Sequence, residues 1–167
     1  MTTATIEKTT KYTMALEAKI DALVNDARKR RAYVHALAMV QFTPKQYARA
    51  IPMLAQQGYG VNVFPVHHVH PPLSMAVIGE HVEAVTALLR LGADVHMTYP
   101  TSSGGRTSPM QLLCELLVKY SRTPRRMIKY RQMLMTCLSY KSDLDKKVHP
   151  AHPQTFRGML AEAGIAI

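Results

Sequence analysis

The residues best suited to chemistry lie close together near the middle of the chain. The stretch FPVHHVHPPLSMAV, residues 64–77, places three histidines, His67, His68 and His70, within four positions. Imidazole nitrogens transfer protons near neutral pH and bind zinc, so both a catalytic cluster and a metal site have to be weighed. Zinc normally takes four converging ligands, and no cysteine, aspartate or glutamate lies nearby to complete a set. On an extended strand His68 and His70 would point to one side and His67 to the other.

Catalysis is not favoured either, because no residue of the sequence stands out as a nucleophile or acid held in a cleft. We therefore expect no catalytic residue, no metal and no cofactor, and the sequence gives no reason to expect a small-molecule ligand. The remaining interpretations of the histidine cluster are packing within a loop or contact with a partner.

Length and composition indicate a single globular domain. The chain has 167 residues, of which 47% are hydrophobic, and this is ordinary for one domain. Cys114 and Cys137 fall within apolar helical patterns and lack a CxxC spacing, which predicts buried free thiols in a reducing compartment. No apolar signal segment is visible, and no apolar run approaches about 18 residues. We expect a cytoplasmic protein that does not contact a membrane.

The positive charge is concentrated in two stretches without acidic residues. The formal net charge is +10, and the two stretches lie between Asp26 and Glu80 and between Glu115 and Asp143. Such blocks suit nucleic acid, an anionic membrane or an acidic protein, and they also suit a merely solvated surface. The candidate contacts with phosphates or with an acidic partner are Arg28, Lys29, Arg30, Arg31, Arg122, Arg125, Arg126, Lys129 and Tyr130.

Helices are predicted to position these residues. After a flexible N-terminus at residues 1–10, apolar residues recur at steps of three and four from Tyr12, which predicts an amphipathic helix over residues 11–29. Asn25 and Asp26 suit the end of that helix and the cap of another one through residues 33–40.

A further helix is predicted after the sequence TPKQ at residues 43–46, which forms a capping box. Pro52 lies inside this helix, so we expect a bend or a late start, and Gly58 should end it. Helices over 71–79 and 80–92 follow, separated from their neighbours by turn-rich loops.

A unit of helix, turn, helix and loop recurs along the chain. The sequence GYGVN begins at Gly58 and GADVH begins at Gly92, which is 34 residues later. Each follows a helix that contains leucine, and each leads into an irregular connection. A third, weakly similar sequence, KSDLD, begins at Lys141. The unit is therefore used about three times, as in repeat proteins.

One of these units resembles the ankyrin repeat, whose period is about 33 residues. The sequence PPLSMAVIGEHVEAVTALLRLGADVH, residues 71–96, is similar to the family pattern TPLHxAxxxGHxEVVxLLLxxGADVN. The match is carried by His81, Glu83, Val85, Leu88, Leu89, Gly92, Ala93, Asp94 and Val95. In this pattern His81 has a structural role at the start of the second helix.

The chain also departs from the family pattern. The tetrapeptide TPLH reads PPLS at residues 71–74 and SPMQ at residues 108–111, so the family's Thr–His hydrogen bond is lost. Glu80 stands where the family has glycine. The segment KYSRTPRRMIKYRQ, residues 119–132, is interpreted as an insertion between the two helices of the third unit. Phosphate binding, a protein interface and a solvated loop all stay open for this segment.

The resemblance implies an all-α fold, namely a short ankyrin-like solenoid with finger-like loops and an N-terminal capping helix. The predicted domain spans 11–167, with the cap at 11–29, units at about 30–70, 71–106 and 107–152, and a truncated unit at 153–167. Terminal units are expected to be atypical because they close the stack.

What the resemblance implies about function is protein binding rather than catalysis. We expect a small adaptor or inhibitor that docks on another, acidic protein through its concave face and through the finger loops 62–70 and 96–107. A short and divergent chain of this kind suits a phage or pathogen protein that acts on a host complex. The alternative is a basic protein that binds nucleic-acid phosphates without sequence specificity. The expected partner contacts are His67, His68, His70, Tyr99 and Arg106.

Overall fold

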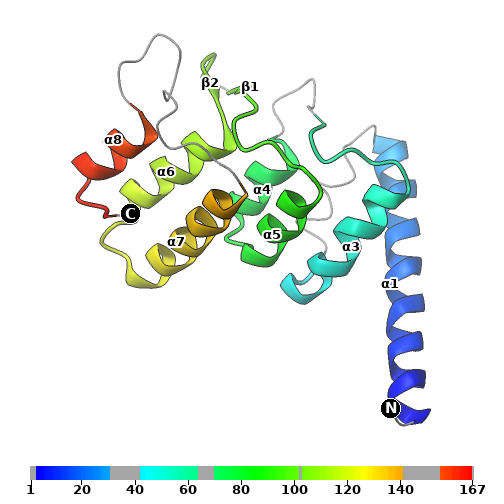
Figure 1. The fold of residues 1–167 in the computed structure, drawn as a ribbon. Coiled ribbons are helices and arrows are strands. Elements are labelled where there is room, and N and C mark those ends of the chain that lie inside the picture. Colours follow the sequence, from blue (N-terminus) through cyan, green and yellow to red (C-terminus); the bar gives the residue numbers. More distant parts are fainter. Residues whose placement is uncertain (1–2, 31–41, 64–69, 102, 141–154, 167) are drawn as a thin grey trace.

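The computed structural model of the protein describes residues 3–30, 42–63, 70–101, 103–140 and 155–166. Within these ranges the chain is predominantly helical, which confirms the all-α prediction, and its strands form one short antiparallel pair. Figure 1 shows the helices stacked side by side, with the long helix α1 at one end of the stack and α8 at the other.

The first element, α1 (Thr3–Arg30), is one helix of 28 residues. The predicted start at residue 11 is wrong, because the helix begins at Thr3. The predicted end at residue 29 agrees with the observed end at Arg30, whereas Asn25 and Asp26 lie inside the helix and do not end it. Residues 3–10, expected to be a flexible tail, are helical. Within the helix the hydroxyls of Thr9 and Thr13 donate to carbonyl oxygens four residues earlier, at 2.8 and 2.9 Å.

Helix α1 packs against the rest of the chain from Tyr12 onward. Leu16, Ile20, Leu23 and Val24 are buried, and their spacing of three and four places them on one face. Arg49 of the next described helix lies over the ring of Tyr12, 5.5 Å from its centroid, and donates a hydrogen bond to the Thr13 hydroxyl at 2.8 Å. The N-terminal end of α1 extends away from the stack (Figure 1). None of the described helices, α1 included, is both long and apolar enough to cross a membrane.

Helix α3 (Pro44–Gln56) begins where the capping sequence predicts. The Oε1 atom of Gln46 accepts a hydrogen bond from the backbone N–H of Thr43 at 2.9 Å, as the side chain at this position does in a capping box. The helix already begins at Pro44 and continues past Pro52. The expectation that Pro52 delays the start of the helix is therefore wrong. The helix predicted over residues 33–40 lies outside the described residues.

Two helix pairs and a final helix follow, with a hairpin between the pairs. Their bounds are α4 (Pro72–Ile78), α5 (Val82–Arg90), β1 (Tyr99–Pro100), β2 (Arg106–Thr107), α6 (Pro109–Lys119), α7 (Pro124–Ser139) and α8 (Phe156–Glu162).

The helices form two layers. Helices α3, α5 and α7 pack in order along one layer, and α4, α6 and α8 pack along the other. The layers are joined where α4 packs on α5 and α6 packs on α7. Because each helix turns an apolar face to its neighbours, the buried residues form one continuous cluster from Leu16 in α1 to Ile165 beyond α8.

Residues 119–132 are not an insertion between helices, contrary to the sequence-based interpretation. Helix α6 ends at Lys119 and α7 begins at Pro124, so only residues 120–123 form the turn. Pro124 occupies the first helical position, where its missing N–H has no cost. The basic residues that follow it interrupt the apolar pattern only because they lie on the exposed side of α7.

Candidate partner-binding surface

Three described helices end at a glycine with positive φ. The φ angles of Gly58, Gly92 and Gly164 are 88°, 84° and 71°. After each glycine, the next N–H donates to a carbonyl five residues earlier, which is the Schellman arrangement. Helix α4 ends in the same way, since His81 donates to the Ala76 carbonyl at 3.0 Å. The position of the glycine is taken there by Glu80, with a φ of 58°.

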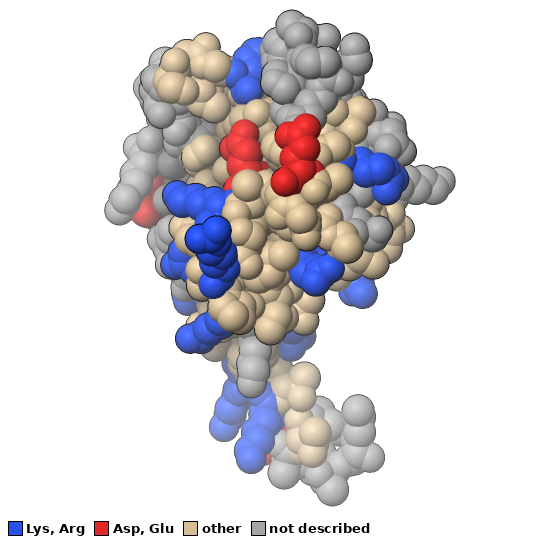
Figure 2. Space-filling view, turned by 90° about the vertical axis from the view of Figure 1, so that its left-hand side faces the viewer, with Lys and Arg blue, Asp and Glu red and all other residues tan. Residues whose placement is uncertain are grey.

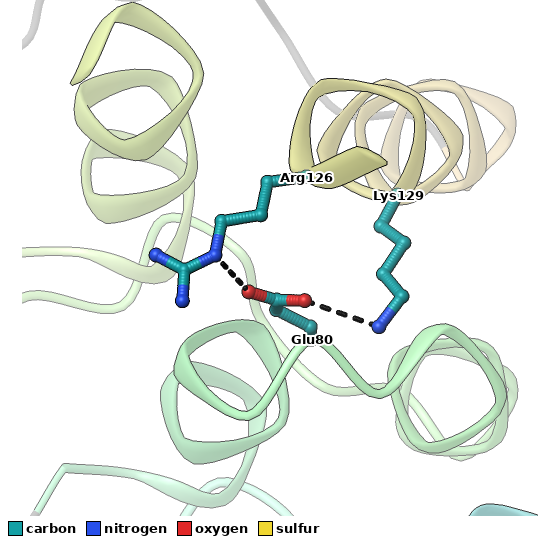
Figure 3. A network of polar contacts seen from close by, with 3 residues as sticks. All are labelled: Glu80, Arg126 and Lys129. Atoms are coloured by element: carbon teal, nitrogen blue, oxygen red, sulfur yellow. Dashed lines mark hydrogen bonds and ion pairs between the residues drawn. The ribbon is translucent and has the colours of Figure 1, made fainter. Parts of the chain in front are cut away.

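The side chain of Glu80 is held by the neighbouring helix pair. The Nε atom of Arg126 lies 2.9 Å from one carboxylate oxygen, and the Nζ atom of Lys129 lies 3.1 Å from the other (Figure 3). Arg126 also lies over the ring of Tyr120, 4.4 Å from its centroid. Two of the predicted phosphate contacts therefore join α7 to the turn between α4 and α5.

Tyr130, another predicted contact, is 2% exposed. Its ring stacks on that of Tyr120, with the centroids 5.9 Å apart, and burial raises the pKa of its phenol. The expectation that Tyr130 meets a partner directly is therefore wrong. Arg122 and Arg125 are exposed instead, and neither forms an ion pair with a described acidic residue.

The hairpin β1–β2 projects from the stack between α5 and α6 (Figure 1). Tyr99 pairs with Thr107, and Pro100 pairs with Arg106. The turn is closed by a hydrogen bond of 2.8 Å from the N–H of Thr101 to the Gly105 carbonyl. Its described residues 103–106 are exposed, so the tip is available to a partner.

The base of this hairpin is fixed by side chains that the sequence assigned to the partner surface. Tyr99 is 1% exposed, and its hydroxyl lies 3.2 Å from the Nδ1 atom of His70. Their rings meet edge to face at 5.5 Å. Burial lowers the pKa of His70 and raises that of Tyr99. Tyr99 is thus a core residue, and its expected direct contact is wrong.

Arg106 is exposed, but its guanidinium already has partners on its own hairpin. The Nη2 atom donates to the carbonyl and to the hydroxyl of Thr98, both at 3.0 Å. Arg106 therefore ties the second strand to the residue before the first strand.

Asn62 connects the two loops that the sequence singled out by their spacing of 34 residues. Its side-chain amide donates to the Gly92 carbonyl at 2.9 Å and accepts from the Asp94 N–H at 2.8 Å. Asp94 in turn accepts from the N–H of His96 at 2.8 Å. This connection was not predicted from the sequence, although the place of Asn62 in GYGVN was the available signal.

The histidines differ in their surroundings. His67 and His68 lie outside the described residues, so the cluster is represented by His70 alone. His81 packs against Tyr47 with the ring centroids 4.8 Å apart, as its structural role required. Burial, followed by the nearby Lys129, lowers the pKa of His81. In the part of the chain that the structure describes, no three His, Cys, Asp or Glu residues lie close enough to hold a metal ion.

Of the two predicted groups of basic contacts, the structure describes the side chains of the second group alone. Arg28, Lys29 and Arg30 end α1, but their side chains, like the whole of Arg31, lie outside the described residues. Helices α1 and α7 lie toward opposite ends of the stack (Figure 1). Figure 2 shows Lys and Arg side chains distributed around the end of the stack, with two acidic side chains adjacent to one another between them.

No family model, curated protein or solved structure matches this chain.

Proposed function

We propose that the chain is a non-catalytic, ankyrin-like interaction module, a small adaptor or inhibitor that docks on another protein through its finger loops and concave face. The observation that carries this proposal is the hairpin at residues 99–107. Its base is fixed by the contact between His70 and Tyr99, while its tip is exposed. A loop that is already ordered loses little conformational entropy when it binds.

The repeated helix endings support the ankyrin-like part of the proposal. Gly58 and Gly92 end the second helices of successive units with the same hydrogen-bonding arrangement, and Asn62 ties the loop of one unit to that of the next. Stacking of this kind produces an extended binding surface. The positive charge suits an acidic partner, which it would attract over a distance and in a salt-dependent way. A host complex in the cytoplasm, blocked by a phage or pathogen protein, is one such setting.

The test is affinity capture from a nuclease-treated lysate, with the captured proteins identified by mass spectrometry. Ser103→Glu changes the exposed tip of the hairpin without removing a buried group. Ser103→Glu lowers the net charge by one unit, whereas Lys11→Glu, on the exposed first half of α1, lowers it by two. The control variant therefore changes the overall charge more than the test variant does. We expect the wild type and Lys11→Glu to retain the same companion at near-equal stoichiometry, and Ser103→Glu to lose it. Equal retention by all three proteins would contradict docking through the hairpin.

The second candidate is nucleic-acid binding, favoured by the exposure of Arg122 and Arg125 beside the start of α7. Unlike Arg126 and Lys129, these two side chains can be reversed without breaking an ion pair with a described residue. If this candidate holds, the double variant Arg122→Glu/Arg125→Glu should bind labelled oligonucleotides at least about tenfold more weakly and should show a smaller salt dependence. An unchanged affinity would exclude this surface from nucleic-acid binding.

A further inference from the structure

A groove lies between α3 and α5, on the layer of helices opposite α4 and α6. Its volume is about 280 Å³, and its walls are formed by Ala48 and Pro52 from α3 and by Val82, Thr86, Ala87 and Leu91 from the α5 region. Pockets that bury whole drug-sized ligands begin at about 300 Å³. The groove is thus suited to one or two large side chains of a partner rather than to a complete ligand.

One wall of the groove carries a polar group that the helix does not satisfy in the usual way. Pro52 lies inside α3 and has no backbone N–H. The carbonyl of Ala48, four residues earlier, therefore lacks the N–H donor that an α-helix normally supplies. Ala48 and Pro52 both line the groove, and Ala48 is exposed. The carbonyl without its usual helical donor therefore belongs to the α3 wall of the groove.

The groove itself carries one charge of each sign, Arg90 and Glu83. Arg90 is exposed and makes no ion pair with a described acidic residue. Because the chain as a whole has a net charge of +10, it would attract an acidic partner, and Arg90 is the cation at the groove with which such a partner can pair.

The apolar surface continues beyond the groove. Leu91, on the groove wall, is 37% exposed, and Tyr140, after α7, is 40% exposed. The hydroxyl of Tyr140 lies 3.3 Å from the Nε atom of Arg90. The groove, Arg90 and Tyr140 thus form one continuous strip across α5, with aliphatic, cationic and aromatic groups in turn.

We propose that this strip binds an acidic segment of a partner protein, whose tryptophan or tyrosine side chain inserts between α3 and α5. The aromatic ring fills the apolar groove, and its N–H or O–H group donates to the Ala48 carbonyl. Acidic residues beside the aromatic residue pair with Arg90. Aromatic anchors seated in small pockets carry much of the binding energy in protein interfaces, and buried Trp and Tyr normally find a hydrogen-bond partner. This site lies apart from the hairpin, so it can be tested independently of docking through the finger loops.

The absence of tryptophan from the chain provides a direct test, since any tryptophan fluorescence must come from the ligand. The probes are synthetic peptides with one central tryptophan flanked by glutamates, together with versions that carry phenylalanine or alanine in its place. We expect a saturable blue shift of the tryptophan emission on addition of the protein. In competition with the tryptophan peptide, the phenylalanine peptide should bind more weakly and the alanine peptide should bind weakest. No blue shift at any protein concentration would overturn the proposal.

Variants then locate the site. Ala48→Tyr adds a ring to an exposed position on the groove wall and should abolish binding while the helical circular dichroism stays unchanged. Arg90→Glu should weaken binding by about tenfold, whereas Lys11→Glu, which changes the charge equally at a distant position, should have less than about a twofold effect. Equal losses in the two charge variants, or full binding by Ala48→Tyr, would show that attraction is non-specific and would overturn the proposal.

A final comparison isolates the carbonyl. Pro52→Ala returns an N–H group to α3 and so occupies the Ala48 carbonyl within the helix. The tryptophan peptide should then lose affinity relative to wild type, while the phenylalanine peptide should not. If both peptides respond alike, the hydrogen bond is not part of the recognition.

Discussion

The carboxylate of Glu80 and the guanidinium of Arg126 lie 2.9 Å apart and join two successive helix pairs. Glu80 has a left-handed φ of 58°, which costs a residue with a side chain about 1–2 kcal/mol relative to the right-handed region. At the equivalent helix ends the chain uses glycine, which avoids this cost. A glycine at position 80, however, could not reach α7. The residue at this turn therefore combines an unfavourable backbone with a favourable contact between units.

Substitutions at position 80 should separate these two effects. Glu80→Ala keeps the unfavourable backbone and loses both ion pairs, so we expect it to destabilise the protein by about 1 kcal/mol. Glu80→Gly loses the same ion pairs but relieves the backbone, so it should be close to neutral, and about 1 kcal/mol more stable than Glu80→Ala. Urea unfolding followed by circular dichroism measures both differences.

The matched background is the double variant Arg126→Ala/Lys129→Ala, in which Glu80 has lost both cations. In this background Glu80→Gly should stabilise the protein, because only the relief of the backbone remains. A destabilising effect of Glu80→Gly in the absence of both cations would contradict this account of the turn.

A second prediction concerns Asn62, whose side chain makes two hydrogen bonds to the backbone of the next loop. Asn62→Ala should destabilise the protein by about 1–2 kcal/mol, since each such bond contributes about 1 kcal/mol. Asn62→Asp keeps the acceptor for the Asp94 N–H but places a carboxylate oxygen against the Gly92 carbonyl oxygen and a second negative charge beside Asp94, so its loss should be at least as large as that of Asn62→Ala. Asn25→Ala, at an exposed position of α1, is the control. If the substitutions at positions 25 and 62 lower the free energy of unfolding by an equal, small amount, the two hydrogen bonds of Asn62 do not contribute to stability.

The features that the sequence predicted well are set by neighbouring residues. The start of α3 follows from Thr43 and Gln46, and its end follows from Gly58, because capping and left-handed turns depend on residues within one helical turn. The helix at residues 82–90 was similarly clear from its apolar spacing.

The failed predictions concern contacts between residues far apart in the chain. Tyr99 and Tyr130 look like surface aromatics beside basic residues, yet they are buried by His70 and by Tyr120. The groove could not be predicted from the sequence either, since its two walls come from separate helices and its polar group arises from a missing N–H at Pro52. Composition gives no signal for any of these arrangements.

A third prediction follows from the burial of His70 and His81, which lowers the pKa of each imidazole below its usual value of 6.5. Below about pH 6.5 the unfolded chain binds protons that the folded chain resists binding, so the free energy of unfolding should fall as the pH falls. The loss is complete below the folded-state pKa values. Urea unfolding at a series of pH values from about 7.5 to 5.5 measures this slope.

The variant His70→Gln/His81→Gln removes both imidazoles and should flatten this dependence, whatever its effect on stability at pH 7.5. The nearby Glu80, Glu83 and Lys129 are retained in this variant, so their contributions cancel in the comparison. A slope that stays as steep as that of the wild type would assign the pH dependence to other groups.

The fourth prediction uses the two thiols, which are free and buried as the sequence predicted. Burial raises the pKa of Cys114 and of Cys137 to about 12, and the thiolate is the form that attacks thiol reagents. Neither residue should therefore react in the folded protein at pH 8, and both should react once it unfolds. The single-thiol variants Cys114→Ala and Cys137→Ala let α7 and α6 be followed separately during urea unfolding. If the structure unfolds as one unit, both thiols should become reactive at the same denaturant concentration as the loss of circular dichroism in that variant. Rapid labelling of either thiol without denaturant would show that its helix opens independently of the rest of the stack.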